Sequence, residues 1–587
     1  MYFDTLVDLP DTPGKIVIQR KKDSAYVHYE YARVYDPVRK FNIPKRVVIG
    51  KVSQEDGSKM HPNQNYLRYF PSAGIPLAMA PSTRSCCLRL GSWMAIRSIV
   101  GHYGLREILE RIAGKDAGLL LDLGAYSLVS ENNAGQYYPD YAYCHPLFTH
   151  AMRIYSDSKV SEFLSTMPED WGARFLNEWN SRMDHRQRIY ISYDSTNKNC
   201  QAGDIGMVEF GHAKDDKGLP VFNYALAYDR TNRIPLFYEE YPGSIVDVSQ
   251  LQFMLQKAKS YGYRRCGFIL DRGYFSKANI QYMDECGYEF IIMAKGIKEL
   301  VSALVLENRG SFENDRRYFV RSHGVYGKTV KARLYADDGR ERFFHVYHSS
   351  SLECAEREDL EDMLGRMEKL LDKYRQKPVD LPQPFSHYYE LYFNEETKAL
   401  MHWKEREDVI RRELSLCGYF SIVTSERMTA GEAIDLYKSR DASEKLFRSD
   451  KSYLGNRSLR VCSEKSAQAK VFIGFIALII RNRLYTLLKD EMGRMDRRPN
   501  YMTVPAALKE LDKIEMARQF DGVYRLDHAL TKTQKVIMRA LGLDKDDVGE
   551  TAGFVSGVLG SEVSAAAACD INAEEDGDGK NEDDGLC

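Results

Sequence analysis

Three acidic residues stand out because of where they lie along the sequence. Asp194 ends the run RIYISYD, and Asp271 directly follows the apolar run CGFIL, so we expect each at the end of a β-strand. Carboxylates at the ends of neighbouring strands can converge on one point, at the edge where open α/β sheets place ligands. Aspartate is also common in turns and helix caps, so either position alone fits a structural role equally well.

The third acidic residue, Glu444, lies in a stretch that also contains Tyr437, Arg440 and Lys451. If this stretch is one α-helix, the four side chains fall within an arc of roughly 60°. One helix face would then carry an aromatic hydroxyl, two cations and a carboxylate. The alternative is a solvent-exposed stripe of ion pairs between residues three or four positions apart.

The spacing Tyr-x2-Arg-x3-Glu-x6-Lys resembles the signature of the DDE transposases of bacterial insertion sequences known as the Tyr-Arg-Glu-Lys group. The segment YISYDSTN around Asp194 resembles the first aspartate motif of that group. The segment LDRGYFS around Asp271 resembles its second. The resemblance covers roughly residues 15–545 and is densest over 187–300 and 416–490.

This resemblance implies an α/β fold with a ribonuclease-H-like catalytic core, in which helices flank a mixed sheet and a β-rich insertion domain interrupts the core. Together with the predicted strands and helices, it suggests seven regions. They are a β-rich region 1–75, a helical region 76–186 that we assign to DNA-end recognition, the first part of the core 187–300, the insertion domain 301–415, the second part of the core 416–495, a C-terminal helical region 496–560 and a disordered acidic tail 561–587.

The resemblance also implies a reaction. Asp194, Asp271 and Glu444 would be the catalytic residues and the ligands of two Mg²⁺ ions, for which Mn²⁺ should substitute. We expect Asp194 to bridge both ions, and Asp271 and Glu444 each to hold mainly one. Water would cut at the end of the element, and the freed 3′-hydroxyl would then attack the target DNA.

Tyr437, Arg440 and Lys451 are the expected DNA-binding residues, since they would bind phosphates beside the cut. The expected partner is double-stranded DNA, in the form of the terminal inverted repeats of the element and the target. Two ends must be joined, so we expect a homodimer in the DNA complex, with residues 503–541 as the candidate contact surface.

The composition is that of a soluble globular protein, and its charge is unevenly distributed. The net charge is -2, but the stretch 570–587 alone carries -7, so the remainder carries +5. Residues 437–470 also carry +5, which suits a phosphate backbone.

The 11 cysteines lack the spacing of a disulfide framework or a zinc site. The most apolar stretch, Val471 to Ile480, is too short to span a bilayer. We therefore expect no membrane partner and a cytoplasmic, nucleoid-associated protein of a bacterium or archaeon.

Two other functions compete with an active transposase. One is a non-catalytic DNA-binding protein derived from a transposase, and the other is a structure-specific nuclease with the same core. Retention of all three acidic residues speaks against the first, and the Tyr-Arg-Glu-Lys pattern with a long insertion speaks against the second. A phosphate-binding loop of the Gly-x4-Gly-Lys-Ser/Thr type does not occur in the sequence.

Overall fold

The computed structural model describes two compact units. Its description leaves out residues 1, 4, 22–23, 38, 55, 72–82, 201–204, 211–217, 295–296, 462, 496–498, 520–521 and 576–587. Unit 1 contains Met1–Thr166 and Arg483–Cys587, and unit 2 contains Met167–Asn482. The three acidic residues singled out above all lie in unit 2. The helical region expected at 76–186 is divided, because its last helix belongs to unit 2.

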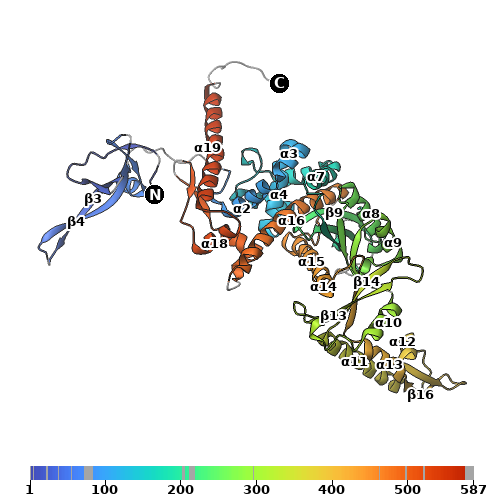
Figure 1. Cartoon of the computed structure of the whole chain (residues 1–587). Helices are drawn as coiled ribbons and strands as arrows, with labels where there is room; N and C mark the ends of the chain where they lie inside the picture. The colour runs from blue at the N-terminus through green and yellow to red at the C-terminus, as the bar shows by residue number, and fades with distance from the viewer. Residues whose placement is uncertain are drawn as a thin grey trace, which may run out of the picture. The chain divides into compact units, whose positions relative to one another are not determined.

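Unit 1 begins with a small antiparallel sheet, in the region where we expected β-structure. The strands are β1 (Val7–Asp8), β2 (Ile16–Lys21), β3 (Ser24–Asp36), β4 (Phe41–Val52) and β5 (Lys59–Pro62), followed by helix α1 (Gln64–Tyr69). Their order in the sheet is β1-β5-β4-β3-β2. A small apolar core surrounds the fully buried residues Val27, Ile49 and Met60. Strands β3 and β4 are much longer than the others and form an extended hairpin (Figure 1).

The rest of unit 1 is mainly helical. Its helices are α2 (Gly91–His102), α3 (Leu105–Ala113), α4 (Ala117–Ser130), α5 (Tyr138–Cys144), α6 (Asp157–Thr166), α17 (Val504–Leu511), α18 (Lys532–Ala540) and α19 (Lys545–Glu575). The C-terminal region is not purely helical, contrary to our prediction. Strands β18 (Glu515–Arg518) and β19 (Tyr524–Leu526) form a hairpin, and β18 pairs with β6 (Cys87–Arg89). Local sequence patterns do not reveal this pairing, because the partner strand lies far away in the sequence.

The C-terminal helix extends into the region that we expected to be disordered. Helix α19 continues through the alanine run to Glu575. Alanine has the highest helix propensity of all residues, so a run of alanines prolongs a helix that has already formed. The remainder of the predicted acidic tail, residues 576–587, lies outside the described residues.

Unit 2 is built on one large mixed sheet. Its strands are β7 (Ile189–Asn199), β8 (Val221–Asp229), β9 (Ile234–Pro242), β10 (Cys266–Leu270), β11 (Glu289–Met293), β12 (Phe319–Val320), β13 (Val325–Arg333), β14 (Glu341–His348) and β17 (Tyr419–Thr424). The strands lie in the order β12-β13-β14-β17-β11-β10-β7-β8-β9. Strand β10 is parallel to both β7 and β11, and the other pairs are antiparallel. All five residues of β10 are buried, as is usual for a central parallel strand covered on both faces.

Helices flank this sheet, in agreement with the predicted α/β class. They are α7 (Asp170–Ser181), α8 (Asp247–Ser260), α9 (Lys277–Cys286), α14 (Ala430–Lys438), α15 (Asp441–Arg448) and α16 (Glu464–Gly493), whose residues from Arg483 on belong to unit 1. Helix α14 opens with the expected capping box between Thr429 and Glu432. Its apolar face packs on Ile269 of β10 and Ile291 of β11.

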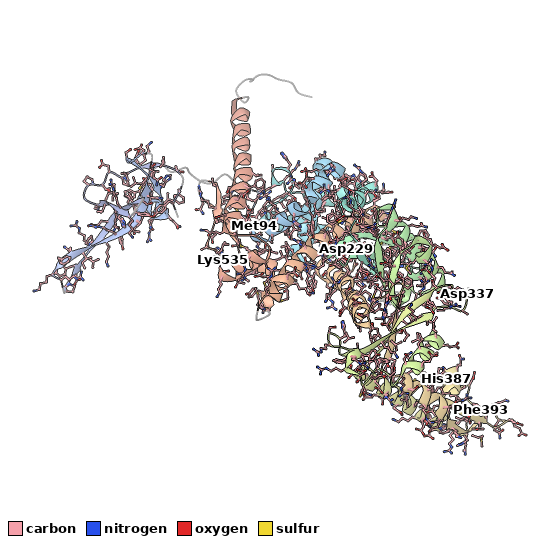
Figure 2. All side chains as sticks on the ribbon, viewed as in Figure 1. Met94, Asp229, Asp337, His387, Phe393 and Lys535 are labelled. Carbon is pink, nitrogen blue, oxygen red and sulfur yellow. The ribbon has the colours of Figure 1, made fainter. Side chains whose placement is uncertain are left out.

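The region 301–415 differs from the β-rich insertion that we expected. Its strands β12, β13 and β14 extend the main sheet, because β14 pairs with β17 of the core. What remains is mainly helical: α10 (Lys298–Asn308), α11 (Ser350–Tyr374), α12 (Gln383–Tyr388) and α13 (Glu407–Leu416), with a hairpin of β15 (Tyr389–Phe393) and β16 (Leu400–Glu405). Helices α11, α12 and α13 and the hairpin share an apolar core of their own, which includes Leu371 and Leu400. Phe393 lies in the protruding hairpin (Figure 2).

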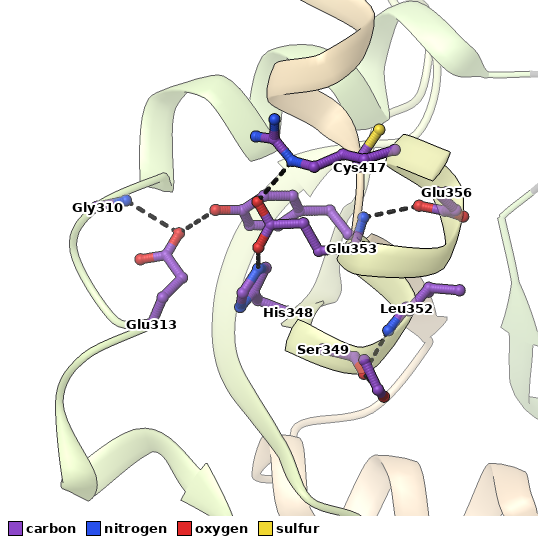
Figure 3. Close-up of polar contacts among 12 residues, drawn as sticks. Gly310, Glu313, His348, Ser349, Leu352, Glu353, Glu356 and Cys417 are labelled. Atoms are coloured by element: carbon purple, nitrogen blue, oxygen red, sulfur yellow. Dashed lines mark hydrogen bonds and ion pairs between the residues drawn. The ribbon is translucent and has the colours of Figure 1, made fainter. Parts of the chain in front are cut away.

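Polar contacts join the long helix α11 to the neighbouring strands (Figure 3). Glu353 Oε2 lies 2.9 Å from His348 Nε2, at the end of β14, and its other oxygen accepts a hydrogen bond from Arg357 Nε at 3.0 Å. The backbone N–H of Gly418, just before β17, donates to Glu356 Oε2 at 2.7 Å. The helical part of the insertion is therefore tied to the sheet at the start of α11.

Helix α16 contains the apolar stretch that we expected to be a buried helix. By length and composition it could cross a membrane, because an 18-residue window has a mean hydropathy of 1.7. The stretch Val471 to Ile480 alone is too short to cross a membrane, whereas the whole helix has 30 residues. Within the protein, 83% of this window is buried, as expected for the core helix of a globular unit.

Candidate active site

Asp194 lies within β7 and not at its end, contrary to our prediction. The strand continues for five more residues, because β8 pairs with it as far as Asn199. Successive side chains of a strand point to opposite faces of the sheet, so Asp194 shares a face with Ser192 and Lys198. Its Oδ1 accepts a hydrogen bond from the backbone N–H of Ser195 at 2.8 Å.

Asp271 directly follows β10, as predicted. In the parallel register Leu270 is the partner of Tyr193, so the next residue on each strand is one of the two aspartates. Neighbouring strands lie about 4.8 Å apart, so the backbone positions of Asp271 and Asp194 are adjacent. The Asp271 side chain is 37% exposed, and it accepts a hydrogen bond from the backbone N–H of Arg272 at 2.7 Å.

The single helix predicted for residues 437–451 is wrong. Helix α14 ends at Lys438, α15 begins at Asp441, and a π-helical turn follows over Ser449–Tyr453. At the break the N–H of Ser443 donates to Arg440 O, three residues earlier, at 2.8 Å. Such bonds wind the chain more tightly than an α-helix does. The four side chains therefore do not form the regular stripe that we calculated.

Glu444 lies near the two aspartates because α15 packs directly on β7. The residue before it, Ser443, is fully buried, and its Oγ lies 2.8 Å from Ser192 Oγ. Ser192 is on the same face of β7 as Asp194, so this contact positions Glu444 over the face that carries the first aspartate. The Glu444 side chain is 55% exposed and remains open to solvent.

Arg440 links two of the three carboxylates. Its Nη1 pairs with Asp271 Oδ1, and its Nη2 donates to Glu444 Oε1 at 3.1 Å. Burial alone lowers the pKa of Arg440, but the negative charges of Asp271 and Asp194 and the nearby Tyr437 hydroxyl together hold it above its ordinary value. The guanidinium therefore remains a permanent cation among the acidic residues.

Tyr437 does not face solvent, contrary to the expected contact with a phosphate. It is only 5% exposed and belongs to the apolar core between α14 and the sheet. Burial raises the pKa of its hydroxyl to about 12. The Arg440 guanidinium carbon lies 5.4 Å from the centre of the Tyr437 ring. The Tyr437 ring therefore stabilises the position of the Arg440 guanidinium, because a cation is attracted to the face of an aromatic ring.

Lys451 lies half-buried in the π-helical turn, next to a buried ion pair that we did not predict. The Nζ of Lys198 is 2.8 Å from Asp450 Oδ2, and both side chains are 1% exposed. This pair joins the turn to β7, on the face that carries Asp194. One sequence signal was present: Ser192, Asp194, Thr196 and Lys198 occupy alternate positions, so one face of this strand is polar.

The three carboxylates offer the hard oxygen ligands that suit Mg²⁺ or Mn²⁺. Among the residues that the structure describes, however, no three His, Cys, Asp or Glu side chains are gathered into a ready metal site. The Arg440 fork lies between two of the carboxylates and supplies a positive charge there. The donor set thus fits divalent cations, provided that Arg440 releases Asp271 or Glu444.

Comparison with known proteins agrees with this chemistry. Residues 191–480 match the family model described as a transposase DDE domain. That segment contains Asp194, Asp271 and Glu444, and the match supports a DDE transposase. No curated protein matches the chain. One similar solved structure is the cryo-EM structure of a piggyBac transposase synaptic complex with hairpin DNA, which has 9% sequence identity and a TM-score of 0.32 over 84% of this chain and 81% of that chain.

Proposed function

We propose that the chain is a transposase that binds the terminal inverted repeats of its insertion sequence, cleaves the DNA ends and joins the 3′ ends to target DNA. The observation that carries this proposal is the pairing of Arg440 with both Asp271 and Glu444, beside the strand that bears Asp194, within a segment that matches a transposase DDE domain. We further propose that the mixed sheet is a ribonuclease-H-like core of the Tyr-Arg-Glu-Lys group.

Asp194, Asp271 and Glu444 would hold two divalent cations, with Mg²⁺ as the physiological ion and Mn²⁺ as a substitute. Bound there, the cations would activate the attacking oxygen and stabilise the leaving oxygen of a phosphodiester. The protein's own contribution is to hold the three carboxylates. The adjacent strands β7 and β10 set the spacing of the aspartates, and the Ser192–Ser443 contact orients the helix that bears Glu444.

Arg440 would exchange partners when DNA binds. Its planar fork can pair with a phosphate as well as with a carboxylate, so a DNA phosphate can replace one of its two carboxylate partners. Lys451 would bind a second phosphate. Tyr437 would act through Arg440 by supporting the guanidinium, and would not touch DNA itself. In this role it is a positioning residue.

We infer double-stranded DNA as the partner and a homodimer as the form that brings two ends together. A cytoplasmic protein associated with the nucleoid of a bacterium or archaeon would meet that DNA directly.

The test is cleavage of a labelled duplex that carries the DNA flanking the coding region, with Mg²⁺ or with EDTA. The wild type should nick at the element boundary only with Mg²⁺, and Glu444→Gln should abolish nicking while binding the duplex normally. Binding without cleavage by the wild type would favour the non-catalytic DNA-binding protein. Cleavage that depends on branched structures and not on the element ends would favour the structure-specific nuclease.

A further inference from the structure

The β3–β4 hairpin of unit 1 extends well beyond the rest of its sheet. Strand β2 pairs with β3 only as far as Tyr29, and β5 pairs with β4 only from Gly50 to Val52. Residues 30–36 and 41–46 therefore form a two-stranded segment, which we call, together with the residues that connect its two strands, the distal ribbon. It pairs from Glu30 and Arg46 to Asp36 and Phe41.

The distal ribbon is basic, and of its described residues only Glu30 is buried. It contains five Lys or Arg residues and two acidic ones. Large apolar side chains lie on its surface as well: Tyr35 is 58% exposed, Phe41 52% and Val34 50%. Exposed apolar groups among cations are costly in a free surface and are typical of an interaction site.

One buried carboxylate orders two arginines on the same face of the distal ribbon. Glu30 is 5% exposed, and its Oε1 pairs with Arg33 Nε at 2.5 Å. Its Oε2 lies 3.3 Å from Arg46 Nη2. The Arg33 and Arg46 side chains remain 65% and 41% exposed. Both guanidinium groups are thus pre-oriented while a large part of their surface stays free for a ligand.

We propose that the distal ribbon enters the major groove of double-stranded DNA, with Arg33 and Arg46 contacting the DNA. The major groove is about 12 Å wide and accepts a two-stranded β-ribbon. The seven residues of β3 from Glu30 to Asp36 give the ribbon a length of about 23 Å, which allows it to follow the groove. The proposal rests on the DNA-binding function proposed above, and it assigns part of that binding to a region outside the transposase DDE domain.

A groove in DNA explains the ribbon better than pairing with a strand of another protein. Pro44 lies on β4 where no further strand pairs with it, and proline cannot donate a backbone hydrogen bond there. Lys45 and Arg46 follow on the same strand, and edge cations discourage the addition of a strand. Phosphates on both sides of a groove, in contrast, match the excess of positive charge.

The experiment compares two full-length double variants with the wild type. Arg33→Gln/Arg46→Gln removes the ordered pair. The control, Arg317→Gln/Arg411→Gln, removes two exposed arginines of unit 2 that also pair with carboxylates and are 84% and 81% exposed. Binding to a fluorescent duplex from the DNA flanking the coding region is measured by anisotropy in EDTA over a series of NaCl concentrations.

We expect the ribbon variant to bind at least about tenfold more weakly, with the slope of log Kd against log [NaCl] reduced by about 2. The control should bind as the wild type does. Equal affinity of the ribbon variant and the wild type would overturn the proposal. So would a loss of affinity that light scattering traces to a change of oligomeric state, because the ribbon would then contact protein. Failure of the wild type itself to bind DNA would instead refute the proposed function.

Discussion

Ser192 Oγ on β7 lies 2.8 Å from Ser443 Oγ on α15, and the two hydroxyls are buried together. Each serine neighbours one of the acidic residues. Ser192 is two residues before Asp194 on the same face of the strand, and Ser443 directly precedes Glu444 on the helix. The close approach of two small side chains lets the helix lie flat on the strand. The distance between the first and third acidic residues therefore depends on this contact.

A larger side chain at Ser443 should displace α15. We expect Ser443→Leu to lower the cleavage rate by about 100-fold, because a shift of about 1 Å in a catalytic group has that effect. Ser443→Ala keeps the close approach and should cut much faster than Ser443→Leu, although the loss of a buried hydrogen bond costs about 1 kcal/mol of stability. Cleavage rates at matched concentrations of folded protein would show this. Equal rates for the two variants would contradict the positioning role.

Removal of the Arg440 guanidinium should make the carboxylates more available to cations. We expect Arg440→Gln to bind Mn²⁺ about threefold to fivefold more tightly than the wild type in the absence of DNA, because a partly exposed ion pair contributes up to about 1 kcal/mol. The same variant should bind the duplex more weakly. Calorimetric titration with Mn²⁺ measures the first effect and anisotropy the second. Unchanged Mn²⁺ affinity would show that Arg440 does not compete with cations.

The hydroxyl and the ring of Tyr437 should contribute very differently to cleavage and to stability. Tyr437→Phe keeps the ring beneath Arg440 and should cut at a rate close to that of the wild type. Tyr437→Ala leaves a cavity in the core and should reduce the free energy of unfolding by about 3 to 5 kcal/mol. Chemical denaturation and the cleavage assay measure these effects. A large loss of DNA affinity in Tyr437→Phe would restore the phosphate contact that the sequence suggested.

Stability should depend on pH through Glu240, which lines a cavity of about 410 Å³ in unit 2. Burial raises the pKa of its carboxyl to about 8, although Lys198 and Lys257 oppose the shift and Glu464 adds to it. In the unfolded chain the same group ionises near 4.5. The folded state therefore loses stability as the pH rises from 4.5 toward 8, because the unfolded state releases the proton first.

Replacing the Glu240 carboxyl by an amide should remove this loss of stability at high pH. We expect Glu240→Gln to raise the midpoint of thermal unfolding at pH 8 by about 2 °C and to leave it unchanged at pH 4.5. Calorimetry of both proteins at the two pH values checks the prediction. A destabilised variant at pH 8 would mean that the ionised carboxylate contributes favourable pairing with the two lysines.

The sequence predicted the features of the site that depend on local pattern. The apolar run CGFIL gave β10 and placed Asp271 at its end, and Thr429 with Glu432 marked the start of α14. Contacts between distant segments were not predictable in this way. The pairing of β14 with β17 places β12, β13 and β14 in the main sheet, and a strand's own residues do not identify its partner.

The helix break has a similar explanation. The residues between Tyr437 and Glu444 are compatible with one continuous helix, and the sequence alone favoured it. In the structure, packing of Tyr437 into the core and of Ser443 against β7 imposes two different faces, and the turn at Ser439 and Arg440 accommodates both. Tertiary contacts thus override a local preference.

The most direct test of the central claim asks whether Asp271 binds the catalytic cation. A thiolate is a softer ligand than a carboxylate and binds Mn²⁺ far better than Mg²⁺. The account predicts that Asp271→Cys does not cleave the element end in Mg²⁺ and recovers cleavage in Mn²⁺, while the wild type cleaves in both. Cleavage by Asp271→Cys in Mg²⁺ at the wild-type rate would contradict the assignment of this carboxylate to the metal site.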